Sequence, residues 1–191
     1  MEKYDGYSIK DFYDKIKEYV DKLIEYEEEA VMLPPAKKED IELYEKSIGK
    51  DILPADYKEW LGYCNGLRIP PANVIHGIGP EIYEWMDVPD GYEQVGETSL
   101  WAYVFSLKDG KFYEWDEGKL KESSCREMLI WHLEQAEDLL YQVQSDRNEL
   151  EIDDEPIEFS KSTLEKMLKF LGPEKYAEFI EDLEKQKTER G

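Results

Sequence analysis

The stretch LWAYVFSLKDGKFYEW, residues 100–115, carries the clearest secondary-structure signal in the chain. Large side chains alternate with smaller ones along its first half, as in a β-strand, where successive residues point to opposite faces. Lys108, Asp109 and Gly110 supply a turn, and KFYEW returns as a second strand. Both faces of this hairpin carry apolar residues. We therefore expect it at the centre of a sheet, with one face against helices and the other partly covered.

Working outward from the hairpin, apolar residues recur at helical spacing in four segments, namely residues 9–26, 36–49, 53–66 and 124–140. The first of these is either a helix that binds a partner or a helix that docks on the protein's own core. It holds fewer than three full heptads, which favours the core. At the start of the last segment, Ser123 or Ser124 can cap the helix.

The aromatic residues of the third segment, LPADYKEWLGYCNG, are predicted to be core residues. The segment contains no nucleophile, base or metal ligand apart from one ordinary cysteine. The same role is predicted for the large side chains of the hairpin. The expected structural core comprises Tyr57, Trp60, Leu61, Trp101, Tyr103, Phe105 and Trp115.

Three regions are expected along the chain. Residues 1–144 form an α+β domain with an N-terminal helix. Residues 145–158 are strongly acidic and are predicted to be a linker or exposed loop, because such a run cannot bury itself. Residues 159–191 have the spacing of a helical hairpin broken at Gly172 and Pro173, and we expect this tail to pack on the same domain.

Charge is the strongest compositional signal, with a formal net charge of −22 over 191 residues. This surface would repel phosphate backbones and so argues against a nucleic-acid partner. A basic protein would be attracted and steered toward it, although solubility alone is an equally good explanation of the acidity. There is no signal-peptide pattern and no apolar run long enough for a membrane span, so we expect a cytoplasmic protein without a membrane partner.

The sequence carries none of the common catalytic signatures. The sequence lacks a Gly-x-Ser-x-Gly elbow, a phosphate-binding loop and a His-Glu-x-x-His motif. His76 and His132 are expected to be structural, and Cys64 and Cys125 to be buried free thiols. No catalytic residue, cofactor or metal site is therefore predicted.

One segment has the composition of a contact site. EIYEWMDVPDGYEQ, residues 81–94, mixes aromatic side chains with carboxylates. Such a loop suits a partner rich in lysine and arginine, because the aromatics provide buried area and the acids provide orientation. The alternative is an irregular loop that folds its aromatics inward. The candidate partner-binding residues are Tyr83, Glu84, Trp85, Asp87, Asp90 and Tyr92.

Two longer segments resemble a known family. LPPAKKEDIELYEKSIGKDILPADYKEWLGYCNG, residues 33–66, resembles the opening of the SUKH superfamily (Smi/Knr-like domains), with its Pro-Pro-Ala lead, short helix, Leu-Pro, Trp-Leu and Asn-Gly. VGETSLWAYVFSLKDGKFYEWDEG, residues 95–118, is similar to that family's Gly-Glu-Thr segment, paired strands and Tyr-x-Trp-Asp end. Residues 124–140 resemble its closing helix, but the usual Ser-Phe-x-x-x-Leu pattern is replaced there. The resemblance spans residues 30–143.

The resemblance implies an α+β fold, in which a mixed, mainly antiparallel β-sheet is flanked by helices, and it implies no enzyme activity. Many bacterial members look like immunity proteins, cytosolic antidotes that bind and block a toxin domain, often a nuclease. Others, including a fungal regulator of cell-wall glucan synthesis, are interaction modules. We therefore expect a non-enzymatic protein-binding module that neutralises a basic toxin domain. A regulatory scaffold in cell-wall synthesis or signalling is the alternative, and monomer and dimer both remain open.

Overall fold

The computed structural model describes residues 2–26, 28–49, 51–78, 87–147 and 176. The chain divides into two compact units, Tyr4–Leu140 and a second one that joins Met1–Lys3 to Tyr141–Gly191. The first unit is an α+β domain, as the sequence predicts, and contains every strand among the described residues. The last helix continues to Arg147, into the segment expected to be a linker. The rest of that linker and, apart from Tyr176, the tail lie outside the described residues.

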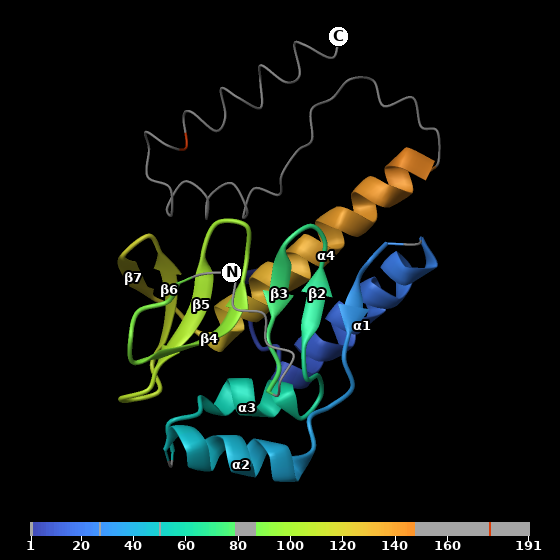
Figure 1. The fold of residues 1–191 in the computed structure, drawn as a ribbon. Coiled ribbons are helices and arrows are strands. Elements are labelled where there is room, and N and C mark those ends of the chain that lie inside the picture. The colour runs from blue at the N-terminus through green and yellow to red at the C-terminus, as the bar shows by residue number, and fades with distance from the viewer. Residues whose placement is uncertain (1, 27, 50, 79–86, 148–175, 177–191) are drawn as a thin grey trace. The chain divides into compact units, whose positions relative to one another are not determined.

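Within the described residues, seven strands form one sheet in which each strand pairs with the next along the chain, and every pair is antiparallel (Figure 1). The strands are β1 (Val31–Met32), β2 (Leu67–Ile69), β3 (Asn73–Ile75), β4 (Tyr92–Glu97), β5 (Ala102–Ser106), β6 (Phe112–Asp116) and β7 (Lys119–Glu122). The predicted hairpin is confirmed as β5 and β6, and β4 and β7 flank it on either side. Its interior position follows from the apolar residues on both faces of β5, which is buried along its whole length.

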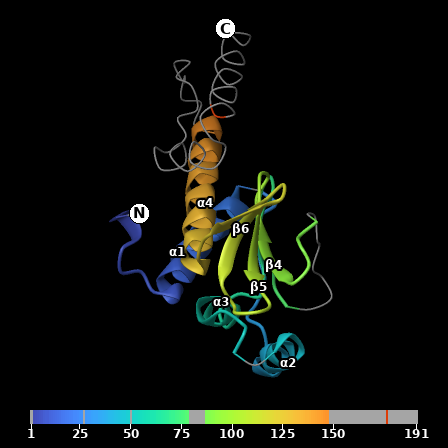
Figure 2. The same ribbon diagram turned by 90° about the vertical axis from the view of Figure 1, so that its left-hand side faces the viewer.

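The helices are α1 (Ile9–Glu25), α2 (Lys38–Ile48), α3 (Ala55–Leu61) and α4 (Cys125–Arg147). Figure 2 shows α1 and α4 on one side of the sheet, with α2 and α3 at one end of the strands. A capping box begins α1: Ser8 Oγ accepts a hydrogen bond from the Asp11 backbone, and the Asp11 side chain accepts one from the Ser8 backbone. The apolar face of α1 is buried in the first unit, with Phe12, Ile16 and Leu23 fully inaccessible.

Six of the seven predicted core residues are buried, namely Tyr57, Trp60, Leu61, Trp101, Tyr103 and Phe105. Trp115 differs because it is only partly buried. Residues alternate between the two faces of β6, and Phe112 and Glu114 are the buried ones. Trp115 therefore belongs to the face of the hairpin that lies away from α4, where the sheet is less deeply covered.

A tight contact between two loops fixes the end of β3. The Asn65 side chain donates to the Ile78 carbonyl at 3.2 Å and accepts from the Ile78 backbone N–H at 2.9 Å. A Cβ atom on Gly77 would lie 1.8 Å from the Asn65 carbonyl oxygen, so only glycine fits there. Tyr57 of α3 adds a hydrogen bond of 2.8 Å to the His76 carbonyl. These contacts hold the chain after β3 against α3.

Candidate protein-binding site

The sheet has one face toward α4 and one away from it. Tyr103 belongs to the first face, because its ring centroid lies 6.1 Å from that of His132 in α4. Gly96 of β4 pairs with Tyr103 in the register. It also faces α4, because a Cβ atom built on Gly96 would lie 2.9 Å from the Met128 Sδ atom. Side chains alternate along a strand. The neighbours Ala102 and Val104 therefore belong to the opposite face, which we call the far face.

On the last two strands, the far face carries four side chains that together form what we call the β6–β7 face: Tyr113, Trp115, Leu120 and Glu122. In the register, Trp115 is opposite Leu120 and Tyr113 is opposite Glu122. Leu120 is 39% exposed, and Glu122 is also exposed. The β6–β7 face is thus an accessible patch that combines two aromatic rings, a leucine and a carboxylate.

The sequence KLKE of β7 separates charge between the two faces of this strand. Lys119 and Lys121 alternate with Leu120 and Glu122, so the lysines point to the face toward α4. There, Lys121 forms an ion pair with Glu114. The far face of β7 consequently presents a carboxylate without a neighbouring lysine from the same strand.

The segment leading into β4 joins this patch. The Trp115 indole N–H donates a hydrogen bond of 2.9 Å to the Asp87 carbonyl. Tyr92 meets Tyr113 edge to face, with ring centroids 5.8 Å apart at 80°. Val104 of β5 lies opposite Tyr113 in the register and is fully buried, so the rings contribute to its cover. Two of the predicted contact residues, Asp87 and Tyr92, are therefore brought beside β6.

The other predicted contact residues are distributed as follows. Asp90 is exposed in the turn before β4. Tyr83, Glu84 and Trp85 lie outside the described residues. Tyr113, Trp115, Leu120 and Glu122 were not among the predicted contact residues, although the alternation of KFYEW and KLKE places them on a single face.

Exposed carboxylates border the patch. Asp87, Asp90 and Glu122 are exposed, and none of them forms an ion pair with another residue in the part of the chain that the structure describes. Helix α1 is different. Its carboxylates alternate with lysines, giving pairs such as Lys10–Asp14 at 2.6 Å, so its surface charge is largely matched. Among the described residues, the carboxylates of the patch are therefore not engaged in ion pairs.

A buried polar cluster occupies the same far face on β3 and β4. The register of β4 shifts between Gln94 and Gly96, which makes Val95 an inserted residue. The bulge places Gln94 and Glu97 on one face, where Gln94 Nε2 donates to Glu97 Oε2 at 2.9 Å. His76 Nε2 lies 3.3 Å from Gln94 Nε2 and 3.9 Å from Glu97 Oε2.

Burial controls protonation in this cluster. His76 is 4% exposed, and burial lowers the pKa of its imidazole to about 4, so it is neutral at pH 7. A neutral Nε2 can accept the second hydrogen bond of the Gln94 amide. Burial raises the pKa of the Glu97 carboxyl, while the hydrogen bond from Gln94 opposes that shift. These groups join β3 to β4 beneath the surface.

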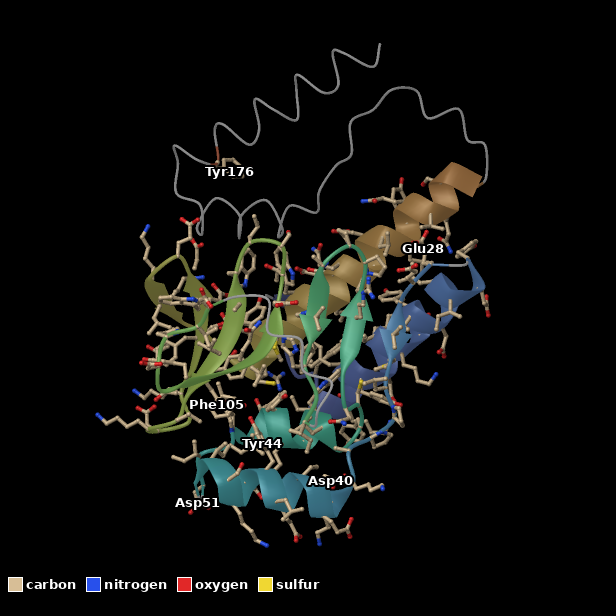
Figure 3. The ribbon with its side chains drawn as sticks, viewed as in Figure 1. Glu28, Asp40, Tyr44, Asp51, Phe105 and Tyr176 are labelled. Carbon is tan, nitrogen blue, oxygen red and sulfur yellow. The ribbon has the colours of Figure 1, made fainter. Side chains whose placement is uncertain are left out.

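At the other end of β4, Tyr44 links α2 to the sheet. Tyr44 extends from α2 toward the strands (Figure 3), and its hydroxyl donates to Glu93 Oε1 at 2.9 Å. Burial and the nearby carboxylate raise the pKa of this phenol, which stays protonated and able to donate. Glu93 is therefore engaged within the domain, unlike the exposed carboxylates of the patch.

The remaining candidate reactive groups have structural surroundings. His132 is fully buried, and its Nδ1 lies 2.8 Å from the Met128 carbonyl. Burial raises the pKa of the Cys64 thiol to about 11 and raises that of Cys125 as well, so both stay protonated at pH 7. Among the described residues, no group of three or more His, Cys, Asp or Glu side chains is arranged to hold a metal ion.

The helices and the comparisons with known proteins add two findings. No helix in the described ranges is long and apolar enough to cross a membrane. Comparison with protein-family models, curated proteins and solved structures gives no match to this chain. The resemblance to the SUKH superfamily accordingly remains a prediction from the sequence motifs.

Proposed function

We propose that this protein is a non-enzymatic protein-binding module of the immunity type, which binds a basic toxin domain in the cytoplasm and blocks it. The single observation that carries the proposal is the β6–β7 face, where aromatic rings share an accessible surface with carboxylates that form no ion pair in the described part of the chain. Protein interfaces are enriched in such aromatic anchors, and their energy is concentrated in a few of them.

The overall charge supports a basic partner. A net charge of −22 attracts a cationic domain over a distance of about one Debye length, roughly 8 Å at physiological ionic strength. This attraction raises the association rate, whereas the aromatic contacts determine how long the complex lasts. If the partner is a nuclease, a surface of carboxylates would compete with its polyanionic substrate.

The resemblance to the SUKH superfamily supports the same function independently, since many members of that family look like antidotes to toxin domains. The regulatory-scaffold alternative uses the same kind of surface with different partners. The two are separated by the identity of the partner and by the number of partners that bind.

The experiment is capture of partners from a lysate of the source cell at low and high salt, performed in parallel with wild-type protein and three variants. Trp115→Leu and Glu122→Gln alter the β6–β7 face. Glu39→Gln removes an exposed carboxylate on α2 and is the matched control. We expect one basic protein, retained by wild type and control, weakened by both face variants and weakened at high salt.

Two outcomes would count against the proposal. If wild type and both face variants capture the partner equally, the binding site does not include the β6–β7 face. Recovery of several envelope-synthesis or signalling proteins in place of one basic domain would favour the scaffold.

A further inference from the structure

We infer that the β6–β7 face binds an arginine side chain of the partner, with the Trp115 indole as the surface on which the guanidinium stacks. This inference rests on the proposed function and specifies which partner group the site recognises. It comes from the orientation of Trp115, the carboxylates near it and the placement of the lysines.

The Trp115 ring is held in place before any partner binds. Its indole N–H is already used in the 2.9 Å hydrogen bond to the Asp87 carbonyl. A partner therefore does not need to satisfy this polar group, and the ring loses little rotamer freedom on binding. A fixed, partly exposed indole presents a π surface, and tryptophan is the aromatic residue that binds cations best.

Two carboxylates lie within reach of a cation on that ring. The backbone carbonyl of Asp87 accepts the hydrogen bond from the Trp115 indole, so the exposed Asp87 carboxylate lies near the edge of that ring. Glu122 is opposite Tyr113 and therefore diagonal to Trp115 across the strand pair, a separation of about 7–8 Å that long side chains span. A guanidinium stacked on Trp115 can donate hydrogen bonds in its own plane to one of these carboxylates.

The positive charges of the hairpin do not fill this position. Lys119 and Lys121 point to the face toward α4, and Lys121 pairs with Glu114 there. The site thus offers an aromatic surface and carboxylate acceptors together, and a planar guanidinium can stack on the ring while its N–H groups reach the carboxylates in its plane, a geometry that a compact ammonium matches less well. Arginine should consequently be preferred over lysine at equal charge.

The test compares two capped peptides of equal length and charge, hexaarginine and hexalysine, titrated calorimetrically into the full chain at an ionic strength of about 0.15 M. We expect hexaarginine to bind about fivefold more tightly, the difference that one exposed stacking contact provides. Trp115→Leu should remove this preference and Trp115→Phe should retain most of it. Tyr141→Leu, which removes a 73% exposed ring of α4, should leave it unchanged.

A second variant keeps the test informative if Trp115→Leu is too unstable to study. Glu122→Gln removes one exposed carboxylate and should weaken hexaarginine binding about two- to fivefold, while Glu39→Gln should weaken it less. Equal binding of the two peptides by wild type would overturn the inference, and so would a preference that survives in Trp115→Leu. The proposed function would still stand if the captured partner were lost from the face variants, so the two failures are distinguishable.

Discussion

Replacement of His76 by glutamine is expected to change how the stability of the protein depends on pH. Glutamine retains an acceptor near the position of Nε2 and removes the titratable ring. Burial lowers the pKa of His76 to about 4 from its ordinary value of 6.5. Between these values the unfolded chain binds a proton that the folded protein does not, so the folded state loses stability as pH falls.

The magnitude follows from this difference. At pH 7 the imidazole is mostly neutral in both states and contributes little proton linkage. At pH 5 the unfolded chain is stabilised by protonation at its pKa of 6.5, which costs the wild-type fold about 2 kcal/mol relative to His76→Gln. Below pH 4 the cost approaches its limit of about 3 kcal/mol. The raised pKa of the Glu97 carboxyl stabilises the folded state as pH falls, which is opposite to the effect of His76. Both proteins contain Glu97, so most of this effect cancels in the difference between wild type and His76→Gln.

The assay is urea unfolding of wild type and His76→Gln at pH 7, 6 and 5, with the difference in unfolding free energy as the readout. We expect this difference to shift by about 2 kcal/mol against the wild type between pH 7 and pH 5. A difference that stays constant would contradict the low pKa of His76 in the folded protein. It would mean that Glu97, at 3.9 Å, attracts the imidazolium strongly enough to cancel the effect of burial.

Two other substitutions and one chemical modification test the packing of the domain. Gly77→Ala should destabilise the protein by more than about 2 kcal/mol in thermal unfolding, because its Cβ would overlap the Asn65 carbonyl oxygen. Gly91→Ala is the control for this overlap: its Cβ meets nothing within 4 Å, so it should cost less, although Gly91 has a positive φ angle and Gly77 does not. Tyr57→Phe should cost about 1 kcal/mol through loss of the hydrogen bond to the His76 carbonyl, and an unchanged melting temperature would contradict that bond. Cys64 and Cys125 should react with a thiol reagent only upon unfolding, and rapid labelling of the native protein would show that these thiols are accessible.

Local periodicity explains which parts of the fold were predictable. The β5–β6 hairpin alternates with period two and contains its own turn, and α1 and α4 repeat their apolar residues at helical spacing. These signals depend on neighbours in sequence. The bulge at Val95 and the contact between Asn65 and Gly77 depend on segments far apart in the chain, and no local sequence pattern predicts them.

Prediction of the site was partial for a related reason. Aromatic composition drew attention to residues 81–94, and two residues of that segment, Asp87 and Tyr92, contact β6. Trp115 was assigned to the core because both faces of the hairpin carry apolar residues. A strict reading of alternation would have grouped Trp115 with Tyr113, Leu120 and Glu122. What sequence alone does not give is which face the helices cover.

The most direct test of the account measures binding of the captured partner to wild type, Trp115→Leu and Glu39→Gln at several salt concentrations. We predict an association rate that falls as salt rises for all three proteins, and dissociation that is at least about tenfold faster for Trp115→Leu alone, as expected for an aromatic anchor. Dissociation from Trp115→Leu at the wild-type rate, with its fold intact, would contradict the claim that the β6–β7 face is the binding site.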